Sequence, residues 1–170
     1  MLGFYLAQTY LQYYLADVVR SFQALGRTLT EAPFQAVALL GLLISLGAAL
    51  ASVPAGRASD RLGRTPLIYL SGAGLGLLMP FLLLFPRYDL LLALALVFGL
   101  FYGVYLAVDW ALVADVLKDP EAHATDMGLW QTAIVVPQVL AGAFGRPLDL
   151  LSAQTPGLGY PVLYLLAALF

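Results

Sequence analysis

The sequence predicts an all-α, multi-pass membrane protein, a six-helix bundle that forms a single transmembrane domain over residues 1–170. Two observations predict this fold class. Hydrophobic residues make up 62% of the chain and charged residues only 11%, whereas soluble domains carry about 25% charged residues. The chain also contains several long stretches without any charge, and an apolar helix of about 20 residues is enough to cross the hydrocarbon core of a bilayer.

Charges, prolines and turn residues divide the chain into the expected helices. No charged residue occurs from Ala32 to Gly56 or from Thr65 to Pro86, so each stretch predicts a membrane span. The final apolar segment is only about half as long as a span, and Met1 begins directly in an apolar segment. We therefore expect a fragment of a longer protein whose last helix is truncated. The expected helices cover about residues 2–19, 33–54, 66–85, 90–117, 127–150 and 160–170.

Glycines recur within two of these helices. Gly72, Gly74 and Gly76 lie in the third expected helix, and Gly142 and Gly145 lie in the fifth. Small residues allow helices to approach closely in lipid, where packing drives their association. We expect close helix contacts at these positions.

The composition argues against several other classes of protein. Cysteine is absent and His123 is the single histidine, so we expect no metal site and no cofactor. The net charge of −2 and the lack of a basic stripe argue against nucleic-acid binding. No nucleophile–base pair or phosphate-binding loop is evident, so we do not expect an enzyme.

A short charged segment, residues 55–65, separates the second and third expected helices. It contains Gly56, Asp60, Arg61, Gly63 and Arg64, which follow the spacing Gly, three positions, Asp, basic residue, one position, Gly-Arg. The glycines permit a sharp turn, and the arginines can pair with carboxylates at helix ends. This pattern between two uncharged helices resembles the signature loop of the major facilitator superfamily, a large group of secondary transporters.

The resemblance implies one half of a twelve-helix fold that works by alternating access, with the signature loop acting as a latch for one conformation. The loop occurs in both halves of the family. Residues 101–112 are similar to helix 10 of the sugar–cation and sucrose–proton symporter branches, and the arginine-bearing motif usual in helix 4 is absent. The chain therefore resembles the C-terminal half, helices 7–12, and we expect the missing N-terminal half as its partner.

Alternation of the spans places loops 55–65 and 118–126 on the same side of the membrane. The positive charges divide four and four between the two sides, but on this side they cluster in two short loops. The clustering and the resemblance favour this side as cytoplasmic, in a plasma or inner membrane.

Asp109 is the main candidate for transport chemistry. A charge at the centre of a membrane helix costs about 2.5–3.5 kcal/mol, so it usually faces a cavity or a partner. Phe98, Tyr102, Tyr105 and Asp109 share one face of the fourth expected helix. This face offers rings, hydroxyls and a carboxylate, which suits a sugar together with a coupled proton. The alternative is a structural aspartate that pairs with a neighbouring helix.

A polar stripe on the first expected helix consists of Tyr5, Gln8 and Gln12 at positions i, i+3 and i+7. In the family that the chain resembles, the corresponding helix lines the central cavity, so the stripe is expected to complete a polyol-binding wall. The two glutamines could instead form hydrogen bonds between helices.

Asp115 lies about 120° around the helix from Asp109, near the loop end. We expect it to face the charged segment and to pair with Arg61 or Arg64. Replacement of Asp115 should then resemble replacement of its arginine partner.

These observations lead to an expected function, secondary active uptake of a sugar or related polyol with a proton or cation. The expected partners are membrane lipid, this small-molecule substrate and the other half of the transporter. A drug or metabolite exporter of the same fold is the first alternative. A non-transporting membrane subunit is an alternative from a different class.

Overall fold

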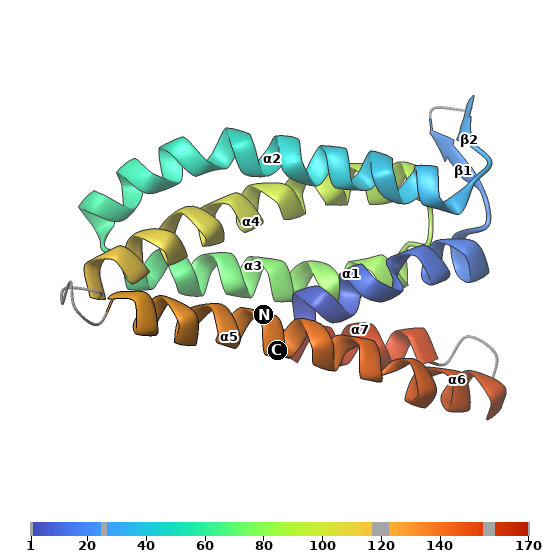
Figure 1. The fold of residues 1–170 in the computed structure, drawn as a ribbon. Helices are drawn as coiled ribbons and strands as arrows, with labels where there is room; N and C mark the ends of the chain where they lie inside the picture. The colour runs from blue at the N-terminus through green and yellow to red at the C-terminus, as the bar shows by residue number, and fades with distance from the viewer. Residues whose placement is uncertain (1, 25–26, 117–122, 155–158, 170) are drawn as a thin grey trace.

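A computed structural model describes residues 2–24, 27–116, 123–154 and 159–169, and Figure 1 shows their arrangement. Within these residues the chain forms seven α-helices, a short π-helix and a two-stranded hairpin, and most of the helices run roughly parallel or antiparallel along one common direction. The elements are α1 (Leu2–Tyr14), the π-helix η1 (Leu15–Val19), β1 (Phe22–Ala24), β2 (Arg27–Thr30), α2 (Pro33–Leu62), α3 (Arg64–Leu84), α4 (Tyr88–Val116), α5 (His123–Ala143), α6 (Gly145–Gln154) and α7 (Gly159–Leu169).

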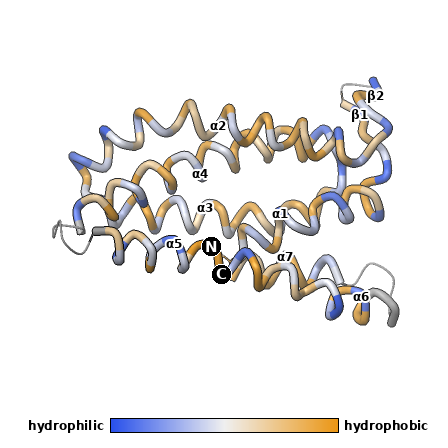
Figure 2. Tube along the Cα trace, in the orientation of Figure 1, coloured by the Kyte–Doolittle hydropathy of each residue, from blue (hydrophilic) through white to orange (hydrophobic). Residues whose placement is uncertain are grey.

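The long helices have the length and apolarity of membrane spans. Within the described residues, four segments qualify, namely α2, α3, residues 88–115 of α4, and residues 124–151 across α5 and α6. Figure 2 shows apolar residues along these helices and hydrophilic residues gathered near the hairpin, the α2–α3 turn and α6. The fold class expected from the sequence, an all-α multi-pass membrane bundle, is confirmed.

The helices α2 and α4 cross so closely that side chains are excluded from the contact. A Cβ atom at Gly99 would collide with the backbone of Ile44, and one at Gly103 would collide with the backbone of Ala48. From the other side, a Cβ atom at Gly47 would meet the backbone of α4. Small residues thus let the two backbones approach each other, as in other membrane helix pairs.

The glycines singled out from the sequence behave in different ways. A Cβ atom at Gly74 would collide with the ring of Phe101 on α4, and one at Gly76 would lie 3.0 Å from the Ala168 carbonyl oxygen on α7. The expectation was wrong for Gly72 and Gly142, where an added Cβ atom would meet nothing within 4 Å. These two residues are exposed, so they lie on the outer face of their helices.

Tyrosine hydroxyls provide polar links between the elements. A buried tyrosine hydroxyl is stabilised when it finds a hydrogen-bond acceptor. Within the described residues, four hydroxyls donate to acceptors on another element: Tyr10 to the Ala141 carbonyl (3.1 Å), Tyr14 to the Leu82 carbonyl, Tyr88 to the Ala36 carbonyl (2.9 Å) and Tyr160 to the Asp17 carboxylate.

The helix α2 is longer than the sequence predicted. It was expected to end at Pro54, but it continues through the charged segment to Leu62. Membrane helices tolerate an internal proline when the freed backbone groups are satisfied nearby. Gly63 then ends the helix with φ of 87°, a conformation that glycine adopts without strain. The turn between α2 and α3 is therefore a single residue, and Gly56 lies inside α2 instead of forming part of the turn.

The expected polar connection between the first two spans contains the β1–β2 hairpin. The two strands pair antiparallel, with Phe22 opposite Thr30. Phe22 is buried and its ring meets the Tyr88 ring edge-on, with 5.4 Å between centroids. This apolar contact holds the hairpin against the beginning of α4.

The expected fifth helix, residues 127–150, consists of two helices. The chain turns at Phe144 between α5 and α6, and Pro147 lies in the first turn of α6, where a proline is tolerated. The helix α5 begins at His123, so the end of the expected loop 118–126 is helical. Residues 118–122 of that loop lie outside the described residues.

Candidate functional site

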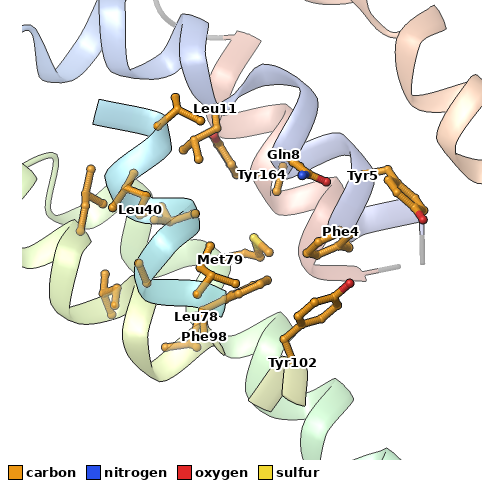
Figure 3. Close-up of a pocket in the computed structure, with 18 of the residues that line it drawn as sticks. Phe4, Tyr5, Gln8, Leu11, Leu40, Leu78, Met79, Phe98, Tyr102 and Tyr164 are labelled. Atoms are coloured by element: carbon orange, nitrogen blue, oxygen red, sulfur yellow. The ribbon is translucent and has the colours of Figure 1, made fainter. Parts of the chain in front are cut away.

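A cavity of about 390 Å³ lies inside the bundle, and Figure 3 shows the side chains around it. The lining comes from α1, α2, α3, α4 and α7. Its volume lies in the range of about 300–1,000 Å³ that is typical of small-molecule sites. Most of the lining is apolar, and the polar side chains are Tyr5, Gln8, Ser45, Tyr102 and Tyr164.

Aromatic rings from α1 and α4 form one side of this cavity. The ring of Phe4 stacks on the ring of Tyr102, with 4.7 Å between centroids and 7° between planes. Phe4 also stacks on Phe98 at 6.0 Å and meets Tyr5 edge-on at 5.5 Å. Such contacts contribute about 0.5–1.5 kcal/mol each beyond their buried area. They hold α1 and α4 together at the aromatic side of the cavity.

Three of the residues predicted from the sequence line this cavity, and others do not. Tyr5 and Gln8 reach it from α1, and Tyr102 reaches it from α4. Tyr105 lines a second cavity of about 140 Å³, which also borders Phe4, Phe98 and Tyr102. Gln12 is exposed and lies outside the lining of both cavities.

Asp109 is partly buried and lies one helical turn beyond Tyr105 on α4. It is outside the lining of both cavities. By helical spacing, Asp109 nevertheless shares a face of α4 with Tyr105, four residues before it, and with Tyr102, seven residues before it. The predicted face of α4 thus continues from the cavities toward the carboxylate.

Several lining residues were missed by reasoning from the sequence. Phe4 and Met79 belong to apolar stretches and carry no signal that separates them from core residues. The Ser45 hydroxyl donates to the Gly41 carbonyl at 2.8 Å, within its own helix. Tyr164 is fully buried on α7, and only its spacing of four residues from Tyr160 marks it in the sequence.

The charged segment meets α4 at one end of the bundle. Arg64 begins α3, and its Nε atom lies 2.5 Å from the Asp115 Oδ2 atom. Asp115 therefore pairs with Arg64, one of the two arginines expected from the sequence. Asp60 and Arg61 are exposed on the last turn of α2, and neither forms an ion pair with the described residues.

The described carboxylates are too dispersed to hold a metal ion. In the parts of the chain that the structure describes, no three His, Cys, Asp or Glu side chains are grouped so that they could hold a metal ion. The arrangement offers a cavity with aromatic, hydroxyl and amide groups, which can bind a small molecule without a metal.

Comparison with known proteins gives one match, to a protein-family model. The model of the Major Facilitator Superfamily matches residues 1–170. No curated protein and no solved structure matches the chain. Members of this superfamily are secondary transporters and generally not enzymes, and a six-helix bundle corresponds to one half of their fold. With a match over its whole length and a bundle of apolar helices, the chain belongs to the major facilitator superfamily.

Proposed function

We propose that this transporter carries a sugar or a related polyol, coupled to a proton or cation, by alternating access. The observation that carries the proposal is the aromatic and hydroxyl-bearing side of the cavity. Tyr5, Gln8 and Tyr102 offer hydrogen-bonding groups there, and Phe4 and Phe98 offer ring faces for the C–H surfaces of a sugar. Tyr105 and Gln12 extend the same polar surfaces along α4 and α1.

Asp109 is the proposed coupling residue. A carboxylate in the middle of a membrane protein is costly unless it has a function or a partner. Within the described residues, Asp109 forms no ion pair. Binding and release of a proton at this carboxylate would change the charge beside Tyr105, at the edge of the smaller cavity.

A second six-helix half is proposed to complete the transport site. In this kind of fold the substrate lies near the midplane of the membrane, between two bundles that rock against each other. The exposed surfaces of α2 and α4 carry large apolar side chains that need lipid or protein to cover them. The C-terminal position of this bundle, as helices 7–12, is part of the same proposal.

The charged segment is proposed to act as a conformational latch on the cytoplasmic side of a plasma or inner membrane. Gly63 supplies the one-residue turn, and the Arg64–Asp115 pair ties that turn to the end of α4. Rocking of the bundle against the other half would form or break this ion pair. Gly56, Asp60 and Arg61, on the last turns of α2, would meet the other half of the transporter.

Reconstitution of the full-length protein in liposomes tests the transport proposal. Uptake of radiolabelled glucose, sucrose and inositol is measured with and without an inward proton or sodium gradient. We expect gradient-driven uptake of at least one of these sugars by the wild type, and a fall in Asp109→Asn to the level of protein-free liposomes. Asp149→Asn, which changes an exposed aspartate on α6, should retain uptake.

Two results would contradict the proposal in different ways. Unchanged gradient-driven uptake in Asp109→Asn would remove Asp109 from the coupling mechanism. Absence of uptake for all three probes under both gradients would remove the sugar assignment.

A second candidate is export of an apolar drug or metabolite. The aliphatic lining from α2, α3 and α4, which includes Leu40, Ile44 and Leu82, favours it. Proton-driven efflux of an apolar dye from the same liposomes, without sugar uptake, would support export.

A further inference from the structure

Tyr164 differs from the other buried tyrosines of the bundle. Its side chain on α7 is 0% exposed, and its ring meets the Tyr14 ring edge-on at 5.2 Å. The hydroxyl oxygen has no hydrogen-bond partner among the described residues. It is also the one buried side-chain nitrogen or oxygen atom of those residues that lacks a partner.

An unpartnered buried hydroxyl is unfavourable in a packed bundle. Loss of hydration without a compensating hydrogen bond destabilises the folded state, and native structures keep few such groups. Two other buried tyrosines, Tyr14 and Tyr88, show the usual solution, because each donates its hydroxyl to a backbone carbonyl of another helix. The Tyr164 hydroxyl has no such acceptor among the described residues. A phenylalanine at this position would fill the same space and leave no polar group unpaired.

The location of Tyr164 at the cavity can explain why an unpaired hydroxyl is present at this position. Tyr164 lines the large cavity, and Figure 3 shows its side chain beside Leu11. The same view shows Leu11 and Leu40 near this part of the cavity, away from Tyr5 and Tyr102. The cavity therefore has an aromatic side at Tyr5 and Tyr102 and an aliphatic side at Leu11 and Leu40, and Tyr164 lies at the aliphatic side.

We propose that the Tyr164 hydroxyl is a hydrogen-bonding site for the cargo, at the aliphatic side of the cavity. The inference rests on the proposal that cargo enters this cavity, but not on the cargo being a sugar. The hydroxyl can donate to an ether or carbonyl oxygen, or accept a hydrogen bond from a cargo hydroxyl. The oxygen is closed off from solvent, so an adjacent aliphatic side chain must rotate to admit the ligand, as is common on binding.

This arrangement makes Tyr164 a specificity-determining residue. A site with a buried hydrogen-bonding group rejects an analogue that lacks the complementary group, because the buried group is then left unpaired. The favoured ligand carries one hydrogen-bonding group on an apolar body at this side of the cavity. Phenol and toluene form a matched pair of probes, because they have nearly the same shape and differ by one hydroxyl.

The test measures binding of both probes to the purified full-length protein in detergent, from the concentration dependence of the melting temperature. For Tyr164→Phe we expect phenol to bind about tenfold more weakly than to the wild type, as for the loss of one good hydrogen bond. Toluene should bind equally to both proteins. Without a probe, Tyr164→Phe should melt at the same temperature as the wild type or higher, because the substitution removes an unpaired polar group.

Tyr14→Phe is the matched control. It also removes one buried tyrosine hydroxyl, but this hydroxyl is already bonded to the Leu82 carbonyl. We expect a lower melting temperature in the absence of probes and the same preference for phenol over toluene as in the wild type.

Three outcomes would overturn the inference. They are equal phenol binding by the wild type and Tyr164→Phe, absence of phenol binding by the wild type, and a loss of stability in Tyr164→Phe like that in Tyr14→Phe. Failure of the sugar proposal is distinguishable from these outcomes, because Tyr164-dependent phenol binding would persist while no sugar is taken up.

Discussion

At the scale of single residues, the Arg64–Asp115 ion pair joins the first turn of α3 to the end of α4. Both side chains are partly exposed, 23% for Arg64 and 55% for Asp115, and exposed pairs typically contribute about 0.2–1 kcal/mol. We expect Arg64→Gln and Asp115→Asn each to lower stability by up to about this amount. The double variant should be no less stable than either single variant, because both remove the same contact.

Thermal or denaturant unfolding of the four proteins in this cycle measures the coupling. Arg61→Gln is the matched control, because Arg61 lies in the same segment but forms no ion pair with the described residues. Its effect should add to that of Asp115→Asn. Coupling of Asp115 to Arg61 instead of Arg64 would contradict the Arg64–Asp115 ion pair.

Residue positions could be predicted from the sequence where periodicity or charge decides them. Helical spacing identified Tyr5, Gln8 and Tyr102 as candidate substrate-binding residues, and all three line the cavity. The expected pairing of Asp115 with Arg61 or Arg64 followed from its position near the loop end of its helix, and the structure pairs it with Arg64. Tyr164 could not be identified, because the lack of a hydroxyl partner depends on which carbonyls the tertiary packing brings near it.

At the scale of elements, the α2–α4 crossing depends on glycine. We expect Gly99→Ala and Gly103→Ala each to destabilise the bundle by about 1–3 kcal/mol, the usual range for overpacking. In each case the added methyl group would collide with the backbone of α2, which cannot rotate away as a side chain can. The melting temperature of the purified variants in detergent measures the loss.

Gly72→Ala is the control for this prediction. Gly72 lies inside α3, and an added Cβ atom there would meet nothing within 4 Å. Alanine is also the better helix former, by about 1 kcal/mol. Gly72→Ala should therefore melt at the wild-type temperature or above it. Equal behaviour of the Gly72 and Gly99 variants would contradict the close crossing of α2 and α4.

The ends of the elements were harder to predict than their existence. The absence of charged residues marks the segments that can lie in lipid, but it does not mark the residue at which a helix ends. For this reason α2 continues past Pro54 into the charged segment, until Gly63 takes a positive φ. The sequence of the hairpin does not predict strands strongly either. The hairpin is held by the contact of Phe22 with Tyr88, and Tyr88 lies on a helix that is distant in the sequence.

At the scale of the whole molecule, the fold class follows from the energetics of lipid. Every backbone polar group in the hydrocarbon must be bonded internally, so long uncharged segments become helices. The helix α2 has 30 residues, which corresponds to about 45 Å, against a hydrocarbon core of about 30 Å. Its charged end must therefore project from the membrane, and the α2–α3 turn and the hairpin lie on opposite sides.

The charges alone do not decide which side is cytoplasmic, but the absence of cysteine makes a direct measurement possible. Arg27 in β2 and Arg57 near the end of α2 are both exposed. In a cysteine-free version of the full-length protein, we expect a membrane-impermeant maleimide to label Arg27→Cys in intact cells. Arg57→Cys should be labelled only after the cells are permeabilised.

The possible labelling patterns separate two questions about the molecule. The reverse pattern would invert the orientation and move the charged segment to the outer side, but it would leave α2 as a span. Labelling of both variants in intact cells would instead contradict the crossing of α2, and with it the alternation of every later helix. Because the backbones of α2 and α4 are in contact at Gly47, Gly99 and Gly103, these two helices must cross the membrane together.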